Sequence, residues 1–115
     1  MWLPDFQQGI ISPTKVIGYL LSFSHRQGRA KAEFFARFGF VADAWTELAD
    51  SLRRHAAGNE VVKIERSPFG TRYIVEGPLT TPDDRNPEVR AVWFVERGET
   101  VPRFVTAYPC RRVVR

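Results

Sequence analysis

The sequence predicts an α+β domain in which N-terminal helices pack on one face of a C-terminal four-stranded antiparallel sheet. One observation is that apolar side chains recur at helical spacing only in the first half of the 115-residue chain. Another is a change after Glu60, where short β-branched and aromatic runs alternate with turn-forming residues. The connectors between these runs are typical of hairpins, which favours antiparallel pairing of consecutive strands.

Three helices are expected, over residues 13–22, 29–38 and 44–57. Ser12 followed by Pro13 is typical of a helix start. Gly39 is a suitable stop for the second helix, and Asp43 is the expected N-cap of the third. The third helix carries an apolar stripe made of Trp45, Leu48, Ala49, Leu52 and Ala56.

Four strands are expected, over residues 61–66, 72–76, 89–96 and 103–108. Their connectors contain proline, glycine and asparagine, which favour turns. Asp83 and Asp84 lie in the longest connector between prolines, so we interpret them as part of a turn and not as metal ligands. The arrangement predicts a single domain over residues 1–115.

The basic residues outnumber the acidic ones, 17 against 13, which gives a net charge of +4. The imbalance is greatest at the C-terminal end, where no acid follows Glu99 but Arg103 and three further arginines do. Arginine binds phosphate bidentately, so this end is a candidate phosphate-binding surface. The alternative is a solvated basic tail.

Several chemistries are absent from the sequence. One cysteine, Cys110, and two histidines do not make a zinc motif, and there is no phosphate-binding loop or nucleophile elbow. We therefore expect no metal and no cofactor. No stretch predicts a membrane-spanning helix or a signal peptide, so we expect a cytoplasmic protein with no membrane partner.

The segment around His25 is the first candidate for a functional site. His25, Arg29 and Lys31 lie within seven residues, and a histidine can exchange a proton near neutral pH. The two cations stand at the expected start of a helix, where the helix dipole disfavours them and where a bound anion would relieve the conflict. The alternative is a surface histidine followed by a solvated cation pair beside Glu33.

The last strand is the second candidate. Thr106 and Tyr108 alternate with apolar residues, so both are expected on one sheet face together with Phe104. If the helices leave that face open, Arg72 and Arg90 can project beside them and bind a phosphate and a base. The alternative is the ordinary strand preference of threonine and tyrosine.

His55 lies in the last turn of the third expected helix. A cation there complements the helix dipole. We therefore assign His55 a structural role.

The pattern formed by His25, residues 28–32, 34–35, 39–40, 92–94 and 102–109 resembles a bacterial toxin-like domain family. That family resembles in turn the metal-independent ribonucleases of the barnase, EndoU, colicin and RelE group and the ribonuclease-A-like contact-dependent inhibition toxins. The resemblance to the domain family covers nearly the whole chain. The resemblance to the ribonucleases depends on the early histidine, the basic helix start and the closing Thr-Ala-Tyr-Pro strand.

The resemblance implies an endoribonuclease toxin of a toxin–antitoxin or toxin–immunity system that cleaves RNA by attack of the 2′-OH. His25 would be the general base or acid, Lys31 or Arg29 would stabilise the phosphorane, and Thr106 and Tyr108 would position the RNA. The second proton carrier would be Tyr108 or a lysine, because His55 lies far along the chain.

The substrate-binding residues expected from their charge and position are Arg29, Arg72, Arg90 and Arg103. We also expect the His25 turn and the last strand to meet in space. The implied partners are RNA and a cognate antitoxin or immunity protein. The implied location is a bacterial cytoplasm, either the cell's own or that of a neighbouring cell. The alternative function is a non-catalytic module that binds nucleic acid or, like an antitoxin or immunity protein, another protein.

Overall fold

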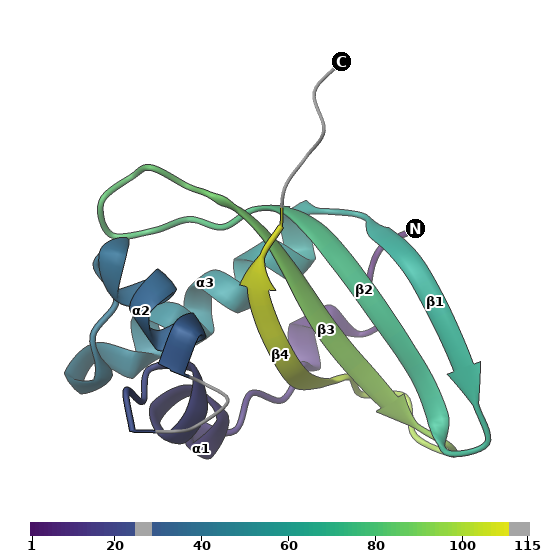
Figure 1. The fold of residues 1–115 in the computed structure, drawn as a ribbon. Coiled ribbons are helices and arrows are strands. Elements are labelled where there is room, and N and C mark those ends of the chain that lie inside the picture. The colour runs from purple at the N-terminus through teal and green to yellow at the C-terminus, as the bar shows by residue number, and fades with distance from the viewer. Residues whose placement is uncertain (25–28, 111–115) are drawn as a thin grey trace.

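The computed structural model describes residues 1–24 and 29–110 and has the predicted α+β architecture (Figure 1). In chain order its elements are η1 (Phe6–Gln8), α1 (Pro13–Lys15), η2 (Val16–Leu20), α2 (Arg29–Arg37), η3 (Ala42–Ala44), α3 (Trp45–Gly58), β1 (Val61–Ser67), β2 (Gly70–Pro78), β3 (Glu88–Glu96) and β4 (Arg103–Pro109). The strands form one antiparallel sheet in the order β1-β2-β3-β4. The prediction of helices followed by a four-stranded meander is confirmed.

The helices do not cover the sheet evenly. In Figure 1, α3 passes behind the sheet, while α1 and α2 lie beyond the β4 edge. The apolar stripe of α3 is buried against the back of the sheet, with Leu48 and Leu52 fully inaccessible, as are Val75 and Trp93 from the strands. The front face of the sheet is therefore left without a covering helix.

The first expected helix is present but changes its winding halfway. It begins at Pro13, and Val16–Leu20 then forms a π-helical turn in which Leu21 N donates to Val16 O at 2.8 Å. Such wide turns occur often at functional sites. The second helix stops as predicted, because Gly39 adopts a φ of +100°, which favours glycine.

The predicted cap of the third helix is wrong. Asp43 lies inside the short 3₁₀ turn η3, and the residue before α3 is Ala44, which makes no side-chain cap. The 3₁₀ turn leads directly into the helix, so Asp43 is a residue too early to cap it. At the other end, Asn59 Nδ2 donates to His55 O at 2.9 Å and satisfies one terminal carbonyl.

The connector between β2 and β3 attaches to α2. Arg85 donates to the carbonyl of Arg37 at 2.6 Å, and its guanidinium carbon lies 4.4 Å from the Phe38 ring centroid. Asp83 accepts a hydrogen bond from Thr81 Oγ1 at 2.8 Å, and Asp84 takes a left-handed φ of 61°. The interpretation of this acidic pair as a turn is confirmed.

His55 joins α3 to the sheet. Its Nε2 lies 3.1 Å from Gly77 O and 2.9 Å from Val89 O, and its side chain is buried. Burial lowers the pKa of His55 below 6.5, because the charged ring would lose its solvation, and the two carbonyls oppose this effect only in part. The role is structural as predicted, but it depends on a neutral ring that bridges two strands and not on a cation at a helix end.

We predict that Leu52→Ala lowers the free energy of unfolding by about 2–5 kcal/mol, because Leu52 is fully buried at the centre of the core. Urea denaturation measures the change. Arg54→Ala, on an exposed position of the same helix, is the control and should change stability by less than about 0.5 kcal/mol. Equal effects of the two substitutions would contradict the packing of α3 described above.

A second prediction concerns pH. The folded-state pKa of His55 is lowered, so the unfolded chain takes up a proton first as the pH falls below 6.5. Stability should therefore be full above that pH and fall below it, by at most about 1.4 kcal/mol per pH unit from this residue. Urea titrations between pH 7.5 and 5 measure it. His55→Gln keeps a hydrogen-bond donor for the two carbonyls but cannot titrate. If the unfolding free energy of this variant depends on pH as that of the parent does, His55 is not the cause of the loss of stability.

Candidate functional site

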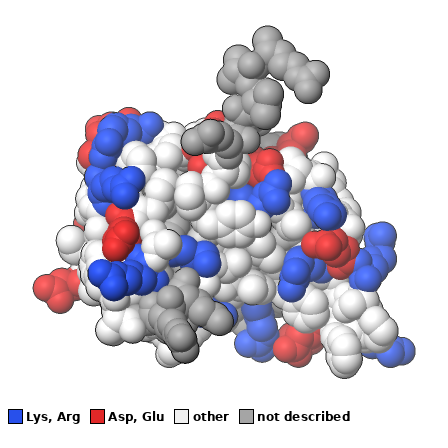
Figure 2. Space-filling view, in the orientation of Figure 1, with Lys and Arg blue, Asp and Glu red and all other residues white. Residues whose placement is uncertain are grey.

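On the uncovered face of the sheet, polar residues surround the apolar side chains of Ile74, Val92 and Phe94, of which Ile74 and Val92 are buried. The pairing register places side by side Glu76, Arg90 and Tyr108 in one row, Ile74, Val92 and Thr106 in the next, and Arg72, Phe94 and Arg103 in the third. Their neighbours along the strands, such as Val75 and Trp93, point into the core. Figure 2 shows this face, with Lys and Arg side chains distributed around a central uncharged area.

A bulge in β4 decides which residues reach this face. Val92 pairs with Thr106 but the next residue, Trp93, pairs with Phe104, so Val105 is the extra residue in β4. Phe104 is consequently buried in the core next to Trp93, with ring centroids 5.5 Å apart. Thr106 and Tyr108 share a face as predicted, but the expectation that Phe104 lies with them is wrong.

Lys31 and Thr106 are brought together by a residue that the sequence analysis did not select, Tyr19. Lys31 Nζ donates to Tyr19 Oη at 2.8 Å and lies 5.1 Å from the centroid of its ring. The Lys31 hydrogen bond lowers the pKa of Tyr19 below 10.0, burial opposes this, and the hydroxyl of Thr106 and the charge of Lys15 lower it further. Lys31, Tyr19 and Thr106 therefore form one polar cluster, contributed by α2, η2 and β4.

Lys31 and Thr106 both contact Tyr19, so the start of α2 lies beside the last strand. The expectation that the His25 turn meets this strand stays a prediction. His25 itself lies outside the described residues, 1–24 and 29–110. Its catalytic role, like those of the other selected residues, stays a prediction.

Arg90 is held in place by its neighbours on the open face. Its Nε donates to Glu76 Oε2 at 2.8 Å, and its guanidinium carbon lies 6.0 Å from the centroid of the Tyr108 ring. The side-chain hydrogen bond with Tyr108 and then that with Glu76 raise the pKa of Arg90, so its charge is permanent. Glu76 is the second residue that the sequence analysis did not select, and it fixes the orientation of an arginine beside Tyr108.

The remaining selected arginines, Arg29, Arg72 and Arg103, are exposed, and Arg29 and Arg103 each form a long ion pair. Arg29 Nε lies 3.4 Å from Glu33 Oε1, and Arg103 Nε lies 4.0 Å from Glu99 Oε2. Exposed ion pairs of this kind are weak, so both guanidinium groups can exchange a carboxylate for a phosphate at little cost. Arg72 and Phe94 both line a hollow of about 250 Å³ on the uncovered face of the sheet.

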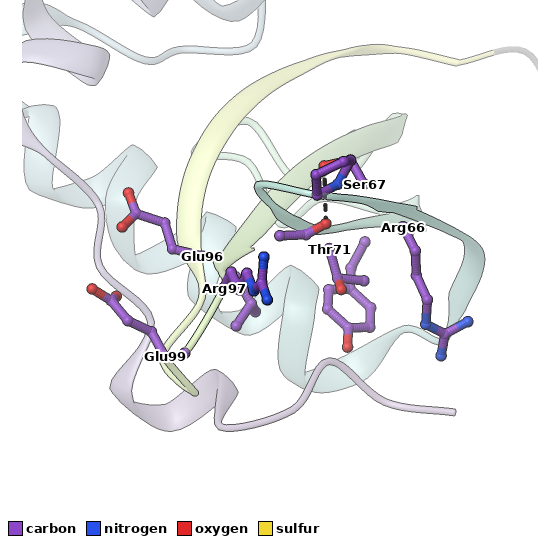
Figure 3. A pocket seen from close by; sticks show the side chains of 11 residues that line it. Arg66, Ser67, Thr71, Glu96, Arg97 and Glu99 are labelled. Carbon is purple, nitrogen blue, oxygen red and sulfur yellow. Dashed lines mark hydrogen bonds between the residues drawn. The ribbon is translucent and has the colours of Figure 1, made fainter.

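A larger hollow, of about 420 Å³, lies near the turns at the far end of the sheet. Figure 3 shows Arg66, Thr71 and Arg97 around it, with Glu96 and Glu99 at one side. The Thr71 and Tyr73 side chains in its lining project from the back face of the sheet, because these residues alternate with Arg72 and Ile74 along β2. It is therefore separate from the Lys31, Tyr19 and Thr106 cluster.

Two kinds of site are not found in the part of the chain that the structure describes. Within residues 1–24 and 29–110, no group of three or more His, Cys, Asp or Glu side chains is placed to hold a metal ion. No helix among these residues has the length and apolar character needed to cross a membrane.

The chain belongs to the family described as a domain of unknown function, DUF6883, which matches residues 2–111. None of the curated proteins matches the sequence. Among solved structures, the fold is similar to that of a chain in a contact-dependent growth inhibition toxin–immunity protein complex from Klebsiella pneumoniae 342. The TM-score is 0.71 at 20% sequence identity, over 88% of this chain and 99% of that chain. At this identity the likeness shows a shared fold.

Proposed function

We propose that this domain is a metal-independent endoribonuclease toxin of a bacterial toxin–antitoxin or toxin–immunity system. The observation that carries the proposal is the cluster of Lys31, Tyr19 and Thr106 at the edge of an open sheet face that also bears Arg72, Arg90 and Arg103. Cations placed on one face attract a phosphate backbone, and a proton carrier among them can act on it.

The proposed reaction is attack by the ribose 2′-OH on the adjacent phosphorus. His25 removes the 2′-OH proton, the 2′-oxygen bonds to phosphorus, and the bond from phosphorus to the 5′-oxygen breaks to leave a cyclic phosphate. Lys31 or Arg29 stabilises the charge that develops on the phosphorane oxygens. Thr106 and Tyr108 position the RNA, while Arg72, Arg90 and Arg103 bind its phosphates.

The proposed partner is a cognate antitoxin or immunity protein that neutralises the toxin in the producing cell. The shared fold with a chain from a toxin–immunity complex supports this part of the proposal. The toxin acts in a bacterial cytoplasm, its own or that of a neighbouring cell. A partner that covers the open face would present acidic side chains to the exposed arginines there.

The second candidate is a non-catalytic module that binds nucleic acid or, as an antitoxin or immunity protein does, a protein. One observation favours it: Arg90 is already neutralised by Glu76, and the exposed Arg72 and Arg103 need only bind. Both candidates require the open face, but only the first requires a proton carrier.

We predict that the purified protein cleaves total bacterial RNA in the presence of EDTA and leaves 2′,3′-cyclic phosphate ends. Arg72→Ala should weaken cleavage most at low salt, because the electrostatic contribution of the lost phosphate contact is largest there and is screened as salt rises. Arg54→Ala removes a cation from α3, on the covered side of the sheet, and is the matched control with unchanged activity. Binding of RNA without cleavage would instead support the second candidate.

A further prediction is that His25→Ala retains the fold but loses toxicity on expression. Removal of a general base reduces the rate by about a hundredfold or more. Growth curves and the circular dichroism spectrum of the purified variant measure the two effects. A variant as toxic as the parent would show that His25 is not the base.

A further inference from the structure

The proposed reaction needs a second proton carrier, because the departing 5′-oxygen must gain a proton while the 2′-OH loses one. Tyr108 and a lysine were the candidates from the sequence. The side chain of Tyr108 is engaged with Arg90, whose other partner is Glu76. Lys31 directs its ammonium group at the phenol of Tyr19. The phenol that lies beside the Lys31 ammonium group is therefore that of Tyr19 and not that of Tyr108.

We propose that Tyr19 is the general acid of this site and gives its phenolic proton to the 5′-oxygen of the RNA chain that leaves. This inference depends on the proposed ribonuclease function. The electron pair of the breaking bond to phosphorus takes up the phenolic proton and yields a 5′-OH. Tyr19 becomes a phenolate and regains a proton from water when the product departs.

Two features of the fold fix the position of the Tyr19 phenol and keep it accessible. Tyr19 lies in the π-helical turn, between the buried Val16 and Leu20, so the backbone on both sides is anchored in the core. Its own side chain is only partly buried and lies against Thr106 at the edge of the open face. The site is thus fixed by the core but open to substrate.

The charges around Tyr19 favour release of its proton. Lys31 from α2 donates to the phenolic oxygen, and Lys15 from α1 lies 5.8 Å from the ring centroid. These two cations and the Thr106 hydroxyl from β4 are the groups that lower the pKa of Tyr19. A phenolate formed during the reaction would be stabilised by the same ammonium group, which makes Tyr19 a stronger acid than a free phenol.

The test compares two leaving groups. An oligonucleotide that spans a site cut in total bacterial RNA is made with either oxygen or sulfur as the bridging 5′ atom. A thiolate leaves without protonation, so only the oxygen substrate needs the acid. Tyr19→Phe should cut the oxygen substrate about 10²–10⁴-fold more slowly and the sulfur substrate within about tenfold of the parent. Tyr73→Phe, which removes a phenol from the back face, is the control and should leave both rates unchanged.

The pH dependence gives a second readout that keeps the tyrosine. Activity should fall as the pH rises through the pKa of Tyr19, and Lys31→Gln should move this alkaline limb to higher pH. Three outcomes would overturn the assignment of Tyr19 alone. They are an equal loss of cleavage rate on both substrates in Tyr19→Phe, no loss of rate on either substrate, and an alkaline limb that Lys31→Gln does not move. A parent protein that cuts no RNA would overturn the ribonuclease proposal as well.

Discussion

The burial of α3 against one face of the sheet is the constraint on which the rest of the molecule depends. Leu48 and Leu52 are fully buried there, and each such side chain contributes about 1.5–3 kcal/mol when it leaves water. His55 adds a polar bridge from the same helix to Gly77 and Val89. Because one face is taken by the core, the other can be polar without loss of the apolar interior.

The bulge at Val105 then determines what the open face displays. In an undisturbed strand Phe104 and Thr106 would point the same way, so either the phenylalanine would lose its place beside Trp93 or the threonine would be buried. The extra residue in β4 allows Phe104 to point into the core and Thr106 to point to the open face. The position of Thr106 beside Tyr19 is therefore a consequence of core packing two residues earlier.

The sequence was sufficient for the order and type of the elements, because helical periodicity, β-branched runs and turn residues are local signals. It was not sufficient for contacts that the tertiary structure creates. In the sequence, Tyr19 occupies an apolar position of a helix and looks like a core residue. Its hydroxyl accepts a hydrogen bond from Lys31, twelve residues later, only in the folded chain. Glu76 and Arg90 are separated by a long connector, so their pairing depends on a strand register that no local pattern fixes.

The start of α2 shows how a contact can change the meaning of a sequence signal. Cations at a helix N-terminus are unfavourable, and from the sequence a bound anion was the natural means to offset them. In the folded chain the phenolic oxygen of Tyr19 accepts a hydrogen bond from Lys31, and Glu33 lies beside Arg29, so the conflict is partly relieved within the protein. The helix start alone is consequently weaker evidence for a phosphate site than the sequence indicated. The Tyr19 phenol is the stronger indication of a functional site, because the hydrogen bond that Lys31 donates to it lowers the pKa of Tyr19.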